Sequence, residues 1–328
     1  MAQIVIALVE SVAIVALLLG GFAYMTLWER KLVGRIQVRY GPNRAGPFGL
    51  LQPVADGLKL AFKEATAPRG ADRWVYPLAP VISVFAALSS FAVIPVGPDV
   101  NAFGTTIPLH LADVSVGILY VLAMSSLGVY GIVLAGWSSN NKYSLLGGVR
   151  SSAQMISYEL SLGLSLVGVL MITGSLRLTD IVSAQAGLPF AVLQPLAFLT
   201  YSIAAVAEVN RAPFDLPEAE TELVAGYHTE YSGLKFAMFY MAEYINMITV
   251  SALATTIFLG GWLAPFGLLS GPWWFLLKVF ILLSAFVWIR ATLPRIRYDR
   301  LMRLGWTFLL PLALLNIVLT AIGIVVFG

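Results

Sequence analysis

Long runs of apolar residues alternate with shorter polar connections along almost the whole chain. Each run carries almost no charge and is close to the roughly 20 residues that a helix needs to cross a bilayer. Eight runs cover residues 4–28, 77–96, 113–137, 153–173, 189–207, 236–263, 273–293 and 304–327. We therefore predict an all-α integral membrane protein, with eight transmembrane helices in a single membrane domain over residues 1–328.

The connection after the first run contains one more helical pattern, at about residues 50–65. Apolar residues recur on one helical face and polar residues on the other. The apolar face holds Leu51, Val54, Ala55, Leu58, Ala61, Phe62 and Ala65, and the polar face holds Gln52, Asp56, Lys59 and Lys63. We predict a short amphipathic helix in this first cytoplasmic loop. It lies either in the membrane interface or packed on its own protein, and the pattern allows both.

The composition supports a membrane protein and excludes several kinds of site. The chain is 59% hydrophobic and 11% charged with a mean hydropathy of +0.85, whereas soluble domains carry about 25% charged residues. It has no cysteine, which excludes disulfides and cysteine-ligated zinc or iron–sulfur sites within this chain. The two histidines are far apart in sequence, so we predict no metal site. Topology explains the basic residues, so the pI of about 9.1 does not indicate nucleic-acid binding.

The basic residues collect in alternate connections. Segment 29–73 contains nine of them, 138–150 two, 209–235 two and 290–304 five. The other connections and both ends contain one, Arg177. Because cytoplasmic loops of membrane proteins are enriched in Lys and Arg, we predict that these four connections face the cytoplasm. The expected location is a bacterial cytoplasmic (inner) membrane, with a multi-pass chain and both termini in the periplasm.

The cytoplasmic connection 208–235 is unusually acidic. Five acids fall within fifteen residues: Glu208, Asp215, Glu218, Glu220 and Glu222. Two prolines prevent a simple helix there. A solvated acidic loop is one interpretation. We favour a folded, partly buried loop, because Phe214, Leu216 and Leu223 are interleaved with the acids.

Several carboxylates fall within the apolar runs, at similar depths. At 1.5 Å of rise per residue, they reach the cytoplasmic third of the bundle from four helices. They are Glu29, Glu159, Glu208 and Glu243. Carboxylates that share a low-dielectric site cannot all stay ionised, so such groups typically exchange protons. The alternative is that an Arg or a hydroxyl neutralises each Glu, and Arg290 is the best candidate for an inward ion pair.

Near the outer face the apolar runs contain only Glu10 and Asp113. We therefore expect this chain to pass protons sideways to other membrane subunits rather than to carry them across the membrane alone.

Two stretches carry a resemblance to a known family. The first is Gly-Pro-Asn-Arg-Ala-Gly-Pro-Phe-Gly-Leu-Leu-Gln-Pro-Val-Ala-Asp-Gly-Leu-Lys-Leu over residues 41–60, and the second is the acidic segment 210–226. Shorter pieces are Trp-Glu-Arg-Lys at 28–31, Ser-Tyr-Glu at 157–159 and Ala-Glu-Tyr at 242–244. In order and spacing the chain resembles, over its whole length, the H subunit of respiratory complex I, the proton-pumping NADH–quinone oxidoreductase.

The resemblance implies roles for particular residues. It implies a quinone chamber lined or braced by Glu29, Arg30, Asp56, Phe214, Asp215 and Arg290. It also implies an acidic funnel for proton coupling, made of Glu159, Glu208, Asp215, Glu218, Glu220, Glu222 and Glu243. The second to sixth helices are expected to resemble half of an antiporter-type channel.

The resemblance also implies the partners. Quinone is the expected substrate, and this chain binds no cofactor of its own. FMN and iron–sulfur clusters are expected in partner subunits. These partners are the hydrogenase-like large subunit and the terminal iron–sulfur cluster subunit of the peripheral arm, together with small and antiporter-like membrane subunits. No residue of this chain is expected to be catalytic in the strict sense.

Three other functions fit parts of the pattern. A secondary transporter also has many helices and buried acids, but its broken helices would be expected near the midplane. A membrane anchor of a related hydrogenase, or of another quinone-reducing complex, would share the acid cluster. A purely structural anchor for a peripheral arm would need none of the acids for proton transfer.

Overall fold

The computed structural model describes residues 2–102, 105–215, 224–264 and 269–327. Its helices are α1 (Ala2–Ile36), α2 (Gln52–Phe62), α3 (Val75–Ser90), α4 (Gly117–Ser138), α5 (Lys142–Thr173), α6 (Leu178–Ala184), α7 (Phe190–Leu193), α8 (Pro195–Glu208), α10 (Gly233–Phe258), α11 (Pro272–Thr292), α12 (Tyr298–Arg303) and α13 (Leu310–Phe327). Turns of 3-10 helix lie at Pro47–Gly49, Phe91–Val93 and Gly226–His228, and a π-helical turn at Leu304–Leu309 joins α12 to α13.

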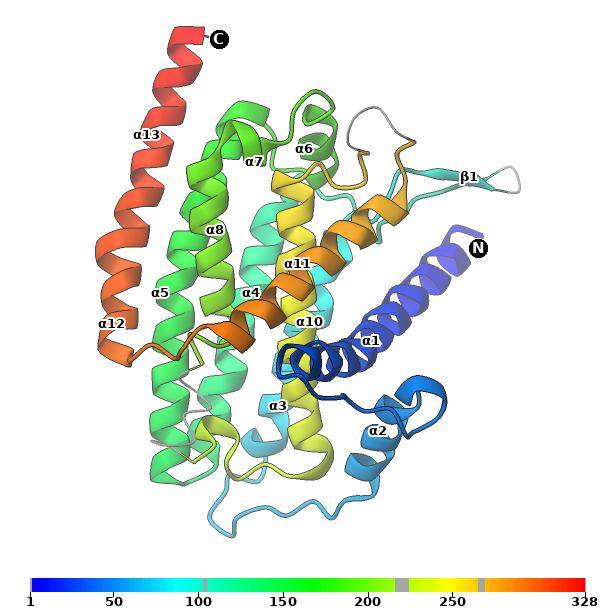
Figure 1. Cartoon of the computed structure of the whole chain (residues 1–328), viewed down its shortest axis with the longest axis vertical. Helices are drawn as coiled ribbons and strands as arrows, with labels where there is room; N and C mark the ends of the chain where they lie inside the picture. The colour runs from blue at the N-terminus through cyan, green and yellow to red at the C-terminus, as the bar shows by residue number, and fades with distance from the viewer. Residues whose placement is uncertain (1, 103–104, 216–223, 265–268, 328) are drawn as a thin grey trace.

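A short hairpin adds to the predicted all-α architecture. Strands β1 (Val100–Ala102) and β2 (Thr105–Ile107) pair antiparallel, with Val100 opposite Ile107. The hairpin projects from the end of the bundle that also carries α6 and α7 (Figure 1). The hydrophobic pattern contains no signal for it, because three residues are too few for an alternating period to appear.

Seven helical segments of the described chain are long and apolar enough to cross a membrane. They are Leu8–Ile36, Val75–Val93, Gly117–Ser138, Lys142–Thr173, Gly233–Phe258, Pro272–Thr292 and Tyr298–Val326. The eighth expected run, 189–207, is divided into α7 and α8, and α8 has 14 residues. The break falls at Gln194, because a residue before proline is disfavoured in helical conformation and Pro195 starts the next helix.

Two helices extend well beyond the apolar runs that predict them. The first run covers 4–28, but α1 continues to Ile36 through Glu29, Arg30 and Lys31. The fourth run covers 153–173, but α5 begins at Lys142, where the Asn141 side chain accepts a hydrogen bond from the Tyr143 amide at 2.9 Å. Hydropathy marks where a helix meets lipid, whereas charged residues can continue the helix into water.

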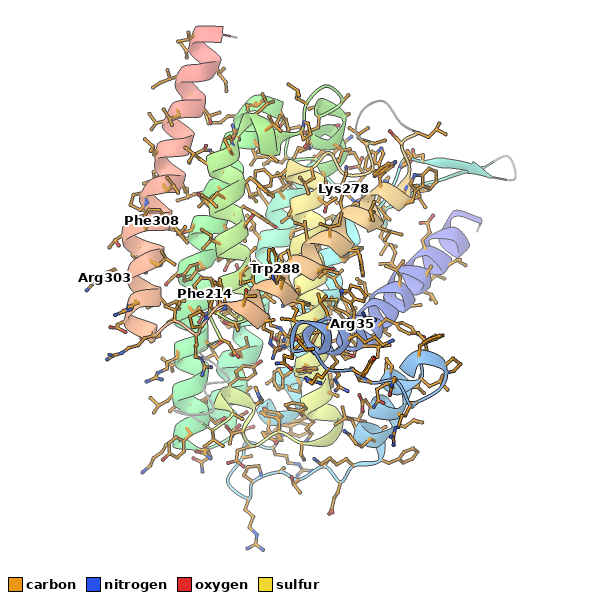
Figure 2. All side chains as sticks on the ribbon, viewed as in Figure 1. Arg35, Phe214, Lys278, Trp288, Arg303 and Phe308 are labelled. Carbon is orange, nitrogen blue, oxygen red and sulfur yellow. The ribbon has the colours of Figure 1, made fainter. Side chains whose placement is uncertain are left out.

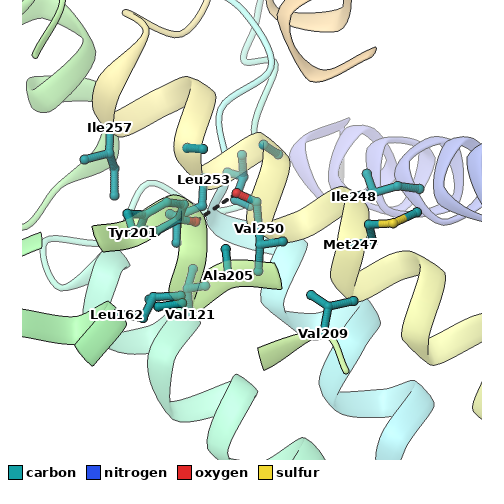
Figure 3. Close-up of a cluster of buried hydrophobic side chains, with 14 of the residues drawn as sticks. Val121, Leu162, Tyr201, Ala205, Val209, Met247, Ile248, Val250, Leu253 and Ile257 are labelled. Atoms are coloured by element: carbon teal, nitrogen blue, oxygen red, sulfur yellow. Dashed lines mark hydrogen bonds between the residues drawn. The ribbon is translucent and has the colours of Figure 1, made fainter. Parts of the chain in front are cut away.

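The central bundle consists of α3, α4, α5, α8 and α10, which run side by side (Figure 1). Helix α13 packs on α5 and α8, while α1 and α11 cross α10 obliquely. Small residues allow close approach: a Cβ on Gly136 of α4 would lie 3.2 Å from the Gly148 Cα of α5. Figure 3 shows part of the core, where Tyr201 of α8 donates a hydrogen bond to the Val250 carbonyl of α10.

Helix α2 packs against α1 and α10, and none of its residues is buried. Its apolar face therefore stays largely open, with Phe62 86% exposed and Val54 and Leu58 more than half exposed. The helix spans Gln52–Phe62, inside the predicted 50–65.

Candidate functional site

A compact group of charges lies where α1, α10 and α11 meet. Glu29 on α1 is 7% exposed and is the centre of this group. Its Oε1 pairs with Nη1 of Arg290 on α11, and its Oε2 accepts a hydrogen bond from the hydroxyl of Tyr244 on α10. The inward ion pair expected for Arg290 is therefore confirmed. The ion pair links α1 to α11, and the Tyr244 hydrogen bond links Glu29 to α10, so Glu29 joins three helices. Removal of either charged partner would leave the other charge in a poorly solvated site.

Arg211 adds a second cation to this group. It follows α8 in the acidic loop and is 5% exposed. Its Nε lies 2.6 Å from Oε1 of Glu243, and its Nη1 lies 3.7 Å from Oε1 of Glu29. The guanidinium carbon is 4.3 Å from the ring centre of Tyr244 and 5.9 Å from that of Tyr240, so the charge also rests on two aromatic faces.

An open polar pocket of about 410 Å³ borders the charge group. Its lining includes Glu29, Arg30, Tyr240, Tyr244 and Arg290. Hydroxyl, guanidinium and carboxylate groups thus converge on one hollow that is large enough for a small planar ring. Such a site offers both hydrogen-bond donors and a stacking surface.

Arg30 connects this pocket to the amphipathic helix. Its Nη1 lies 2.8 Å from Oδ2 of Asp56 on α2, and the Gln52 side chain donates to the other oxygen of Asp56 at 3.1 Å. The side chains of Arg30 and Asp56 are 50% and 26% exposed, so water screens their attraction. This ion pair therefore positions α2 beside α1 rather than adding much stability.

A second group of carboxylates lies deeper in the bundle, on α5 and α8. Glu208, at the end of α8, is 7% exposed and accepts a hydrogen bond from the Ser125 hydroxyl on α4. Glu159 on α5 accepts one from the neighbouring Ser126. Adjacent residues of one helix thus hold both acids. The other oxygen of Glu208, Oε2, has no hydrogen-bond partner among the described residues.

A cavity joins Glu208 to the charge group. Its volume is about 40 Å³, and it is lined by Glu208, Asn210, Asp215, Glu243 and Asn246, among others. A second cavity of about 30 Å³ has Glu208, Ser125 and Asn246 in a lining that is otherwise mostly apolar. Glu208 and Asn246 border both, so one carboxylate faces two hollows. Both linings combine apolar side chains with a few polar groups, and a cavity of this size has room for a few water molecules next to its polar groups.

The remaining predicted site residues are placed as follows. Asp215 borders the cavity and lies 3.9 Å from Nη2 of Arg295. Phe214, labelled in Figure 2, is buried against Tyr158, with ring centres 6.0 Å apart, and its carbonyl accepts a hydrogen bond from Gln154. It does not appear in the lining of the polar pocket around Glu29. Three predicted acids, Glu218, Glu220 and Glu222, lie outside the described residues.

Sequence reasoning misses several residues of the site. Arg211 and Tyr244 lie within stretches that carry the family resemblance, but neither of them is assigned a role from the sequence. Tyr240 has no charge that would single it out. Ser125 and Ser126 are consecutive hydroxyls within an apolar run, a signal that a search for partners of the acids would find. The pairing itself is tertiary, so spacing within one helix cannot show it.

Similarity to known proteins agrees with this geometry. The sequence pattern of the NADH dehydrogenase family matches residues 9–321. The NADH-quinone oxidoreductase H subunit of Thermomicrobium roseum is 56% identical over 330 residues, covering 98% of this chain and 96% of that protein. One of the H subunits of Geobacter metallireducens is 57% identical, covering 92% of this chain and 90% of that protein.

The chain belongs to the H-subunit family of NADH-quinone oxidoreductase. A third relative, from Syntrophobacter fumaroxidans, is 54% identical over 96% of this chain and 95% of its own length. The resemblance stated from the motifs is thus confirmed, and a member of this family is a membrane subunit of an enzyme complex. The family also fits the seven long apolar helices.

Proposed function

We propose that this H subunit borders the quinone chamber of its complex and couples quinone reduction to proton translocation through its buried acids. In this proposal the pocket around Glu29, called the chamber side below, is the part of the quinone chamber that this chain forms. The cavity of Glu208, Asp215 and Glu243 is the start of the acidic funnel. Glu159 continues the funnel, and Glu218, Glu220 and Glu222 are proposed to extend it.

One observation carries this proposal. The cavity that contains Glu208 also contains Glu243, and Glu243 pairs with Arg211, which lies beside Glu29 of the polar pocket. The two hollows are therefore connected through named ionisable groups rather than through apolar packing. Ionisable groups kept inside a membrane protein at high desolvation cost generally have a functional role.

The chamber side has the chemistry to bind a quinone headgroup. Its lining of Tyr240, Tyr244, Arg30 and Arg290 offers donors to a carbonyl oxygen. Reduction to the quinol requires two electrons and two protons. In this proposal the electrons come from the peripheral-arm partners, the hydrogenase-like and terminal-cluster subunits, which depend on FMN and iron–sulfur clusters.

Coupling follows from electrostatics. Electrons that arrive on a quinone place negative charge beside Glu29 and Arg290, which changes the free energy of ionising the nearby carboxylates. Protons then move within the acid cavity and onward to small and antiporter-like membrane subunits. For the topology we propose eight crossings, with α7 and α8 together as the additional one, and both termini periplasmic in a bacterial inner membrane.

The replacement Glu208→Gln tests the proposal in the assembled complex. Gln keeps the size of the side chain and the acceptor for Ser125 but cannot carry a proton, so we expect quinone-linked proton pumping to fall by more than half. The measurement is the number of protons moved per NADH oxidised in inverted membrane vesicles. The amount of intact complex on a native gel shows whether the variant assembles. The matched control is Glu64→Gln, at an exposed position in the first long connection.

The alternatives give different results in the same assay. A structural anchor keeps pumping intact in Glu208→Gln, which would contradict the proposal. A hydrogenase anchor gives a complex that lacks NADH oxidation, and a secondary transporter gives solute uptake by the isolated chain in vesicles.

A further inference from the structure

Arg211 is buried between two carboxylates that belong to different hollows. Its guanidinium lies 2.6 Å from Glu243 and 3.7 Å from Glu29, measured from Nε and Nη1 respectively. Glu243 borders the cavity of Glu208, whereas Glu29 borders the open polar pocket. One cation thus contacts one carboxylate from each of the two hollows.

The two contacts are unequal. Glu243 is the nearer partner, while Glu29 already has Arg290 and the Tyr244 hydroxyl. Coulomb attraction falls with distance, so the guanidinium is held mainly by Glu243 as long as that acid is ionised. If Glu243 takes up a proton, its attraction weakens, and Glu29 becomes the strongest anion near the guanidinium.

The surroundings of Arg211 permit such a movement. Within the described part of the chain, its Nη2 has no hydrogen-bond partner although the atom is buried. The guanidinium lies over the ring of Tyr244, with Tyr240 next to it. The Nη1–Oε1 distance to Glu29 is 3.7 Å, so a shift of about 1 Å would bring the guanidinium to the ordinary length of a charge-assisted hydrogen bond. Such a shift is small enough to keep the cation within reach of the Tyr244 ring.

We propose that Arg211 is a positioning residue that exchanges ion-pair partners between Glu243 and Glu29. Protonation of Glu243 from the Glu208 cavity moves the guanidinium onto Glu29, where it competes with Arg290 and so alters the pocket. Loss of the same proton returns it, so no proton is consumed. Within the part of the chain that the structure describes, the charged and titratable groups facing the guanidinium are Glu29, Glu243, Arg290, Tyr240 and Tyr244. The inference rests on the proposed function and names how its two hollows communicate.

Two variants distinguish an exchange of ion-pair partners by Arg211 from a site that needs only equal numbers of positive and negative charges. Arg211→Lys keeps the positive charge but lacks the flat, forked guanidinium that reaches both acids. The pair Arg211→Gln with Glu243→Gln removes one charge of each sign and leaves the net charge of the site unchanged. Both are made in the full complex, with Arg297→Gln, an exposed arginine, as control.

We expect both variants to assemble and to oxidise NADH with a short-chain quinone at more than half the control rate. We expect the protons moved per NADH to fall below half of the control value in both. A structural ion pair predicts instead that Arg211→Lys, which keeps the positive charge, pumps normally. The double variant also removes Glu243, an acid of the proposed funnel, so Arg211→Lys is the variant that separates the two interpretations. Normal pumping in either variant overturns the exchange, and so does failure of both to assemble, which would make Arg211 a structural residue.

The parallel Glu208→Gln measurement distinguishes the two proposals. Reduced pumping in Glu208→Gln with normal pumping in the Arg211 variants contradicts the exchange alone. Normal pumping in Glu208→Gln contradicts the proposed function itself.

Discussion

Single residues in this chain show how charge is accommodated in a membrane protein. Lys278 lies inside an apolar run, yet its ammonium donates to the carbonyls of Leu259, Gly261 and Leu263 at 2.6, 3.0 and 2.8 Å. These carbonyls follow the last turn of α10, where acceptors have no partner within the helix. Figure 2 places Lys278 at that end of the bundle. A cation there matches the negative end of the helix dipole.

Asp72 gives a pH-dependent prediction at the residue scale. Its Oδ1 accepts hydrogen bonds from the amides of Val75 and Trp74, both at 2.9 Å, at the start of α3. These donors hold the pKa of Asp72 below its ordinary value of 3.8. Because the folded pKa is the lower one, the carboxylate stabilises the fold above pH 3.8, and this contribution is lost as the pH falls through the folded pKa.

We therefore expect Asp72→Asn to lower the thermal unfolding midpoint of the purified protein slightly at neutral pH. Asn keeps the oxygen acceptor and lacks the charge, so the difference from the natural chain should vanish at the acidic end of a pH series. Asp72→Ala is the comparison, since it loses the acceptor at every pH. A difference in unfolding midpoint between the natural chain and Asp72→Asn that stays constant with pH would contradict a stabilising role for the Asp72 charge.

Sequence reasoning locates the acids and, among their partners, only Arg290. Glu159, Glu208 and Glu243 can be placed by helical rise alone, because depth depends on distance along one helix. Glu208 and Glu243 border one cavity, whereas Glu159 does not line it and instead meets Ser126. The contact of Arg211 with Glu29 joins segments 182 positions apart (211 − 29), which no local pattern encodes.

At the scale of elements, close helix approach depends on glycine at defined positions. A Cβ on Gly147 of α5 would lie 2.6 Å from the Cα of Gly226, in the turn that follows the acidic loop. The Ser144 hydroxyl, one turn away, donates to the Tyr227 carbonyl at 2.9 Å. Tyr227 lines the cavity of Glu208, so this contact positions one wall of the candidate site.

We expect Gly147→Ala to destabilise the protein by about 1–3 kcal/mol, because the added methyl meets backbone that cannot move aside easily. Gly163→Ala on the same helix is the matched control, since its Cβ would lie 3.8 Å from the nearest atom, on Leu122. Thermal unfolding of the purified complex measures both. Equal unfolding midpoints for the two variants would show that the turn at Gly226 moves to accommodate the added methyl group, and would contradict the prediction.

At the scale of the whole molecule, the number of membrane crossings determines whether the two termini lie on the same side of the membrane. An even number puts both termini on one side, and α8 decides between seven and eight. Its 14 residues rise about 21 Å, less than the roughly 30 Å of a hydrocarbon core. The four residues of α7 precede it, and α8 runs beside α5 in the bundle (Figure 1). Eight crossings also agree with the alternation of basic connections.

Cysteine labelling tests this topology against a clean background, because the chain has no cysteine of its own. Ala186→Cys lies before α7 and Leu234→Cys lies after α8, and both positions are exposed. If α7 and α8 cross the membrane, a membrane-impermeant maleimide labels the thiol at position 186 in intact spheroplasts and the thiol at position 234 in inverted vesicles. Labelling of both positions from the same side would mean that α8 does not cross. The acids at its end would then lie far from the depth that the proton-coupling proposal requires.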